Sequence, residues 1–193
     1  IVEYSKQYPD APKDFMPWDL AYYRELYKTE KYSLNDELVK PYFQLEKVEE
    51  ASFMLANKLY GITFKPNNKI QVYNPDAKAF EVYDKDGSFL AVLYVDYFPR
   101  DNKRGGAWMG NFRNMSTTAD GEEIRPVVTL NYNFTKPTAE SPSLLTFYEF
   151  TTVLHEFGHG LHGIFAKGKY ESLTGTGVYR DFVELPSQLM ENW

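Results

Sequence analysis

The spacing of hydrophobic positions changes along the chain, and its first third has the period of helices. Apolar side chains recur there every three or four residues, as in an amphipathic helix. Pro17 opens a helix that we expect to reach about Lys28. A short second helix is ended by Pro41, and a third covers 45–60, with Gly61 at the position where helices stop.

The middle third predicts strands. Four runs are rich in β-branched and aromatic residues, and they span 70–74, 79–84, 88–98 and 125–134. The second and third runs flank Lys85-Asp86-Gly87, which is typical of a hairpin turn. The glycine-containing stretch 103–114 is interpreted as a loop. Together these features predict a small, largely antiparallel sheet of about four or five strands.

A long helix follows the strands. Thr146 and Glu149 form a capping-box pair in the sequence, and Lys167-Gly168 marks the expected end. The apolar residues between them step by three and four along one stripe, which consists of Phe147, Phe150, Leu154, Phe157, Leu161 and Ile164. This periodicity predicts one face turned toward the core.

These elements define an α+β fold without an internal repeat or a flexible linker. We expect a helical part over 1–66, a sheet part over 67–140 and the helices of the functional site over 141–193, with the N-terminal helices packed against the sheet. The chain begins without Met and ends in a helix-like run. We therefore expect residues 1–193 to be a segment of a longer protein.

Composition narrows the classes of partner. The net charge of −6 argues against binding nucleic acid, and the absence of cysteine excludes thiolate metal ligands. No apolar run approaches the roughly 20 residues that span a bilayer. We expect a soluble, cytoplasmic protein without a membrane or nucleic-acid partner. A periplasmic location stays open because the N-terminus of the parent protein is absent.

All three histidines lie between positions 155 and 162. His155 and His159 are one helical turn apart, so both imidazoles can bind one zinc ion at ~2.0–2.1 Å. Glu156 is turned by about 100° from His155 and can take a proton from the attacking water and pass it to a leaving amine. The pattern is H-E-x-x-H, although a solvated polar face is the simpler alternative. Gly158 indicates that a strand or a substrate approaches this helix closely.

A catalytic zinc ion needs a third protein ligand and an open fourth position. Without cysteine or another free histidine, the third ligand must be a carboxylate, and the candidates are Glu171, Asp181, Glu184 and Glu191. His162 falls outside the pair, so we expect it to support the ligands or to line the cleft.

Three further segments add to the HEFGH motif: "RDFVELPSQLMENW" (180–193), "PWDLAYYRE" (17–25) and "KRGGAWM" (103–109). With them the chain resembles the thimet-oligopeptidase family of zinc peptidases over about residues 17–193. The resemblance implies Glu184 as the third ligand, one zinc ion per chain, short peptide substrates and a larger, mostly helical zincin-type domain. It also implies that later Tyr and His residues, which contact the substrate in the family, are absent here.

The segment "GLHGIFAKGKYESLTGTGVYRDFVE" (160–184) is more similar to the peptidyl-dipeptidase branch, which releases C-terminal dipeptides. One alternative is an endo-acting oligopeptidase with the same chemistry. A second alternative is a zinc-binding fragment without activity of its own.

Several neighbouring residues have two interpretations each. Asp181 either accepts the second ring N–H of a metal-bound histidine or caps the helix that carries Glu184. Gly105 and Gly106 either let a substrate backbone lie along a sheet edge or form a plain turn. Lys103 is expected to be solvated.

Overall fold

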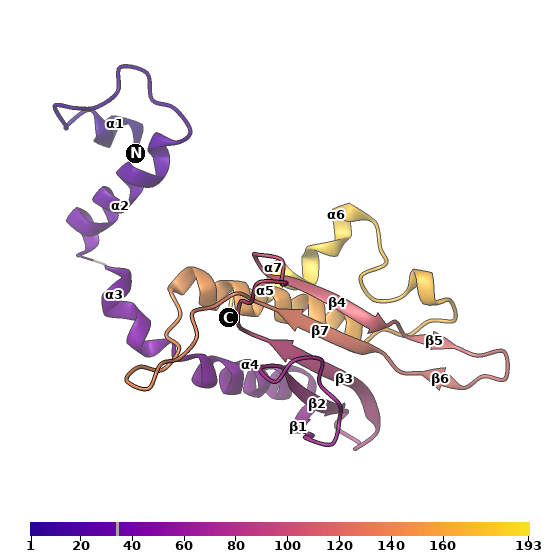
Figure 1. Ribbon diagram of the computed structural model, residues 1–193. Helices are drawn as coiled ribbons and strands as arrows, with labels where there is room; N and C mark the ends of the chain where they lie inside the picture. The colour runs from indigo at the N-terminus through magenta and orange to yellow at the C-terminus, as the bar shows by residue number, and fades with distance from the viewer. Residues whose placement is uncertain (34) are drawn as a thin grey trace.

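The computed structural model describes residues 1–33 and 35–193, and these form an α+β fold (Figure 1). The helices are α1 (Val2–Ser5), α2 (Asp19–Tyr32), α3 (Asp36–Val39), α4 (Leu45–Tyr60), α5 (Phe147–Ile164), α6 (Arg180–Val183) and α7 (Leu185–Met190), with 3₁₀ turns η1 (Lys40–Tyr42) and η2 (Glu171–Leu173). The strands are β1 (Thr63–Pro66), β2 (Lys78–Tyr83), β3 (Phe89–Asp96), β4 (Trp108–Arg113), β5 (Ser116–Thr117), β6 (Glu123–Ile124) and β7 (Val127–Asn131).

The main sheet is mixed. Its five strands lie in the order β1-β2-β3-β7-β4, and β5 pairs with β6 in a separate two-stranded sheet. Three pairings in the main sheet are antiparallel, but β3 and β7 run parallel. The chain leaves β3, forms the outer strand β4, and returns between the two as β7. The expectation of a largely antiparallel sheet is therefore corrected at this one pairing.

The first strand lies at the end of the stretch 1–66, which was expected to be the helical part. Gly61 ends α4 in the left-handed conformation, with φ of 80°, and the chain turns directly into β1. The predicted strand over 70–74 is wrong, because turns at both ends hold this segment out of the sheet. The Ile70 N–H donates to the Asn67 carbonyl, and the Ala77 N–H donates to the Asn74 carbonyl.

The stretch 103–114, which the sequence suggested was a loop, contains strand β4. Its pairing with β7 places Trp108 opposite Asn131 and Gly110 opposite Thr129. The register shifts after Asn111, so alternation along the sequence is interrupted there. β4 is an edge strand, and the side facing away from β7 is therefore the place where another backbone can pair.

Helix α5 begins as predicted. Thr146 accepts from the Glu149 N–H, and the Glu149 side chain accepts from the Thr146 N–H, which confirms the capping box. The helix ends at Ile164, earlier than Lys167, because the Phe165 backbone leaves the helical conformation.

Glycines allow α5 to pack closely on two sides. A Cβ on Gly160 would lie 3.1 Å from Leu130 of β7, so this side meets the sheet. A Cβ on Gly158 would lie 2.5 Å from the Pro186 carbonyl oxygen and 2.6 Å from the Ser187 Cα. The expectation that a strand or substrate approaches Gly158 is therefore wrong, because the backbone of α7 occupies that space.

Helices α4 and α5 share one apolar core with the sheet. Phe53 of α4 stacks on Phe64 of β1 at 4.2 Å between ring centroids, and it also contacts Phe157 of α5. Elsewhere on the sheet, Tyr73 contacts the rings of Tyr94 and Phe112. Of the predicted N-terminal helices, α4 is the one that joins this core.

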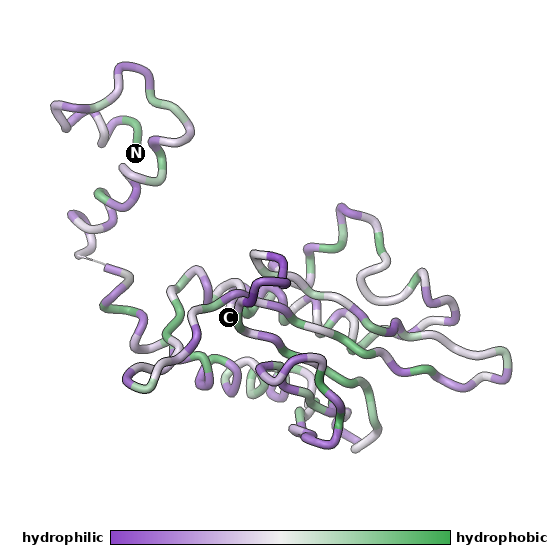
Figure 2. The backbone as a smooth tube through the Cα atoms, in the orientation of Figure 1, coloured by the Kyte–Doolittle hydropathy of each residue, from purple (hydrophilic) through white to green (hydrophobic). Residues whose placement is uncertain are grey.

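Helices α1 and α2 lie apart from the sheet (Figure 1). Their aromatic side chains pack on one another, with Tyr4 against Tyr27 and Tyr8 against Tyr23. Hydrophobic and hydrophilic residues are mixed along these helices (Figure 2), and the described part of the pair buries one large apolar side chain, Tyr23. The expectation that they pack on the sheet is wrong, because they form a small aromatic cluster instead.

Candidate metal centre

Three side chains from two parts of the fold converge on one point. His155 and His159 project from α5, and Glu184 lies at the junction where α6 ends and α7 begins. The Glu184 Oε2 atom is 3.2 Å from the His155 Nε2 and 3.1 Å from the His159 Nε2. Ligands ~2.0–2.1 Å from one tetrahedral ion lie about 3.4 Å from each other. The three side chains could therefore hold one metal ion.

The protonation of His155 favours a cation at this point. Its Nδ1 lies 2.6 Å from the Glu191 Oε1. A carboxylate accepts but does not donate, so this nitrogen carries the proton. In the neutral ring the Nε2 lone pair then faces the Glu184 carboxylate, and the two repel unless a positive charge lies between them. Either a metal ion or a second proton on His155 supplies that charge.

For the other two members, the direction of the pKa shift favours the charge state that a metal ligand requires. His159 is 9% exposed, and burial lowers the pKa of its imidazole, which favours the neutral ring. A hydrogen bond from Ser187 lowers the pKa of Glu184, and the nearby histidines lower it further. The Ser187 hydroxyl donates to the Glu184 Oε2 at 2.8 Å, so it also holds the carboxylate in place.

Glu156 lies beside the cluster without belonging to it. Its side chain is 7% exposed, and burial raises the pKa of its carboxyl, while His155 and the Met109 backbone act in the opposite direction. A carboxyl whose pKa is raised toward neutrality is better able to accept and return a proton. Its position therefore suits proton transfer near the cluster.

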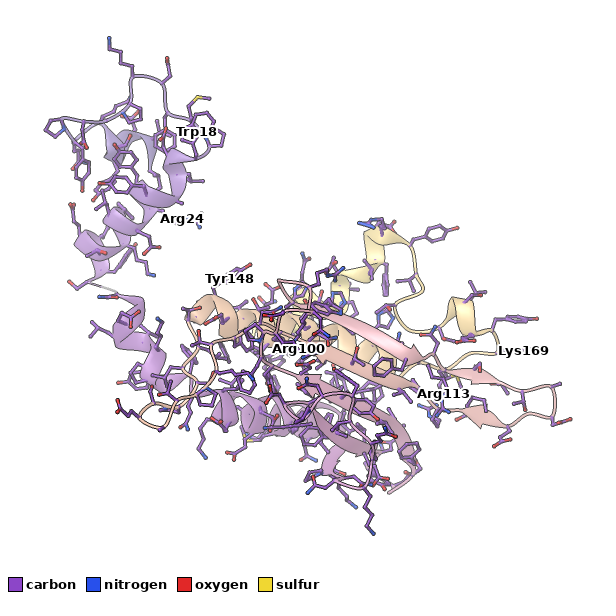
Figure 3. The ribbon with its side chains drawn as sticks, viewed as in Figure 1. Trp18, Arg24, Arg100, Arg113, Tyr148 and Lys169 are labelled. Atoms are coloured by element: carbon purple, nitrogen blue, oxygen red, sulfur yellow. The ribbon has the colours of Figure 1, made fainter. Side chains whose placement is uncertain are left out.

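The cluster opens into a cleft with two hollows. One, of about 280 Å³, is lined by Ala107, Trp108, Met109, His155, Glu156, His159, Thr176, Val183 and Glu184. The other, of about 270 Å³, is lined by Ala107, Tyr148, Thr151, Thr152, His155, Glu156 and Glu191. Tyr148 extends outward from the first turn of α5 (Figure 3). Ala107, His155 and Glu156 line both hollows, so His155 lies between them, whereas His159 and Glu184 line only the first.

The remaining predicted site residues lie outside the cluster of candidate ligands. Asp181 is exposed in the first turn of α6, and within the described chain its side chain has neither a histidine nor a helix-capping partner. The described chain gives Asp181 neither of the partners that the sequence suggested, and Glu191 makes the contact with the second ring nitrogen of His155. His162 contacts the ring of Phe182 and lines a separate apolar hollow. Gly105 and Gly106 are exposed, just before β4.

Three contributors to the site were missed at the sequence level. Glu191 was considered as a ligand but not as the partner of His155, since that contact depends on how α7 packs. Ser187 gave no signal beyond its place in the matched motif. The lining role of β4 was hidden because the strand itself was interpreted as a loop.

A mixed sheet is covered by a helix that carries two histidines and a buried glutamate, and a second carboxylate lies beside them. This arrangement is typical of a candidate metal site. The profile of peptidase family M3 matches residues 3–193. The chain therefore belongs to peptidase family M3, and the expected resemblance is confirmed.

Similar proteins agree with this assignment. The chain is 48% identical to dipeptidyl carboxypeptidase of Salmonella typhimurium over 177 residues, which are 91% of this chain and 26% of the relative. It is 42% identical to oligopeptidase A of Escherichia coli over 181 residues, or 93% of this chain and 27% of the relative. A probable cytosolic oligopeptidase A of Arabidopsis thaliana is 40% identical over 182 residues, or 91% and 26%. The chain thus spans about a quarter of the length of these relatives.

Proposed function

We propose that residues 1–193 are the metal-binding part of a zinc-dependent peptidase that hydrolyses short peptides. The observation that carries this proposal is the convergence of the His155 and His159 Nε2 atoms on one oxygen of Glu184. A solvated polar face would not bury His159 or bring a carboxylate from another helix to both rings. Family membership supports the same reaction class.

The donor set fits zinc. Two imidazole nitrogens and one carboxylate oxygen are typical of catalytic zinc sites, which leave a fourth position open. In this position zinc would polarise the scissile carbonyl and make the attacking water more acidic. We propose one ion per chain. The Glu191 contact fixes the orientation of His155, as carboxylate partners do for metal-bound histidines.

Glu156 is proposed as the general base and then the general acid. Its carboxylate, buried beside the cluster, would take the proton of the attacking water and deliver it to the departing amine nitrogen. The raised pKa of this carboxyl suits both steps, because it reduces the cost of holding the proton between them.

The substrate backbone is proposed to lie along the edge of β4. This strand borders the cleft, and Ala107 to Met109 line it next to Glu156. An extended peptide can add to such an edge through main-chain hydrogen bonds. Gly105 and Gly106 precede this edge, and a Cβ on either would meet nothing within 4 Å, which leaves room for a bound chain.

Release of C-terminal dipeptides is the proposed specificity, supported by the resemblance to the dipeptidyl carboxypeptidase. Internal cleavage is the alternative, supported by the likeness to oligopeptidase A. A peptide with an amidated C-terminus separates them in the full-length parent. We expect amidation to abolish cleavage, whereas an endo-acting enzyme would cleave both forms. We also propose a cytoplasmic location, as for the Arabidopsis relative.

The central test is Glu156→Gln in the full-length parent. We expect one bound zinc ion per chain, as in the wild type, and a loss of several orders of magnitude in kcat, because proton transfer is lost. Glu140→Gln, on an exposed loop, is the matched control and should retain full activity. Normal turnover by Glu156→Gln would contradict the proposed role, and loss of zinc would show that Glu156 is a ligand.

A further inference from the structure

Lys103 is buried, contrary to the expectation that it is solvated. Its side chain is 3% exposed, and its ammonium lies 2.8 Å from the Asp96 Oδ1. It also donates to three backbone carbonyl oxygens, those of Asp96 at 3.0 Å, Phe98 at 2.8 Å and Tyr132 at 2.5 Å. One cation therefore joins the end of β3, the segment after it, and the residue that follows β7.

Asp96 balances this charge from a fully buried position. Arg100 contacts the same carboxylate at 2.8 Å, and Figure 3 shows Arg100 in the main body of the molecule, far from Trp18 and Arg24. Burial alone would raise the pKa of Asp96, but the hydrogen bonds from Lys103 and Arg100 lower it. Burial lowers the pKa of Lys103, the Asp96 carboxylate acts in the opposite direction, and the nearby Arg100 guanidinium lowers this pKa further. The cluster is a fixed charged anchor.

Asn133 makes a second attachment to the same segment. Its side-chain amide donates to the Arg104 carbonyl at 2.9 Å and to the Gly106 carbonyl at 2.6 Å. The backbone from Lys103 to Gly106 is therefore tied on both sides to the residues that follow β7. Two glycines in this stretch would otherwise give it wide conformational freedom.

The tied segment leads directly into the wall of the cleft. Ala107 lines both hollows, and the Met109 backbone acts on the Glu156 carboxyl. Neither Lys103 nor Asn133 lines either hollow, so both act only through the backbone that follows them.

We propose that Lys103 and Asn133 are positioning residues, which hold the Ala107–Met109 backbone at its place opposite Glu156. The identity of the ligand in the cleft rests on the proposed function, whereas the positioning of the backbone does not. The charged anchor lies outside the metal cluster. It therefore fixes the backbone that forms the wall of the cleft without fixing the positions of the candidate metal ligands.

Hydrogen–deuterium exchange on the 193-residue chain tests the positioning directly. In Asn133→Ala, amides of residues 104–111 should exchange at least tenfold faster, while amides of β2 and β3 keep the wild-type rates. Lys103→Met should show the same local effect, together with lower overall stability. Asn57→Ala is the matched control, because the Asn57 amide donates to the Ile62 carbonyl at 3.0 Å, away from the cleft.

Binding measurements separate this proposal from the proposed function. Zinc affinity of Asn133→Ala should stay within threefold of the wild type, while a phosphinic peptide should bind the zinc-loaded chain about tenfold more weakly. If neither zinc nor the phosphinic peptide binds the wild-type chain, the proposed function fails, and the exchange result still decides the positioning role. Unchanged exchange over 104–111, or an equal increase throughout the chain, would overturn the inference even if Lys103→Met does not fold.

Discussion

His155 is the central residue of the candidate metal site, because its two ring nitrogens contact two different carboxylates. Glu191 fixes the proton on Nδ1, and Glu184 faces Nε2. A histidine held in this way presents an unprotonated nitrogen to a metal ion without needing to rotate. The pair of contacts explains why Glu191, and not Asp181, supports the cluster.

The contact between His155 and Glu191 can be tested by metal affinity. We expect Glu191→Gln to weaken zinc binding about 10–100-fold, as loss of such partners does, and Glu184→Ala to weaken it more. Competition with a chromophoric chelator measures both. Asp181→Asn is the control, since Asp181 is exposed, and it should bind like the wild type. Equal affinity of Glu191→Gln and the wild type would show that the contact does not orient the ring.

Asp96 should make the protein sensitive to acid. Its pKa is lower in the folded chain than in the unfolded chain, so its contribution is complete above the ordinary Asp pKa of about 3.9 and is lost as the pH falls through the folded value. Breaking a buried pair costs about 3–5 kcal/mol. Urea unfolding at pH 7 should therefore show Asp96→Asn destabilised by about 3 kcal/mol.

This difference should shrink at pH 3, below the ordinary Asp pKa of about 3.9, because the carboxyl of the unfolded wild-type chain takes up a proton there more readily than that of the folded chain. Asp76→Asn is the comparison, because its partner Lys136 is half exposed, and it should change stability little at either pH. A difference for Asp96→Asn that is independent of pH would show that charge is not its contribution.

At the scale of elements, the sequence predicts what local chemistry determines. The capping box at Thr146, the glycine stop at Gly61 and the hairpin before β3 are all local signals. β4 and β1 depend on partners far along the chain, so their composition did not identify them. The residues of the site differ in the same way. The His155–His159 spacing is a local signal and was predicted, whereas Ser187 and Glu191 reach the cluster only through the packing of α7.

The packing of α7 on α5 can be tested at Gly158. A Cβ there would meet backbone atoms of Pro186 and Ser187 at 2.5 Å and 2.6 Å, which cannot move independently. Such overpacking costs about 1–3 kcal/mol, against about 1 kcal/mol gained in helix propensity. We expect Gly158→Ala to lower the free energy of unfolding by up to about 2 kcal/mol in urea titrations and to weaken zinc binding.

Gly105→Ala is the matched control, because a Cβ there meets nothing within 4 Å. It should change stability by no more than about 0.5 kcal/mol. If Gly158→Ala were as stable as the wild type and bound zinc equally well, α7 would not depend on this close approach.

At the scale of the whole molecule, α7 and the residue at position 193 expose apolar side chains. Leu185, Leu189 and Trp193 are 56%, 55% and 64% exposed, and the first two line an apolar hollow of about 480 Å³. Contiguous exposed apolar surface favours association. None of the described helices is long and apolar enough to cross a membrane.

We predict that the 193-residue chain binds zinc, self-associates, and hydrolyses peptides barely above background. From the family resemblance we expect substrate-contacting Tyr and His residues to lie outside these positions, and loss of one oxyanion donor alone costs about 10²–10³ in rate. Sedimentation velocity over a concentration series measures association, which Leu189→Ser should reduce. Addition of the remaining part of the parent domain should restore turnover. Full activity of the isolated chain would place the oxyanion donors within residues 1–193.

Glu184 reaches the two histidines only while α7 lies against Gly158. The position of this proposed ligand therefore depends on the packing of two helices and not on local sequence. With zinc as the ion, its binding would stabilise that arrangement by mass action. A cell short of zinc would hold a larger share of molecules whose last helices are open, and proteases cut open segments first. The concentration of zinc would then determine how long the protein survives proteolysis as well as how fast it hydrolyses peptides.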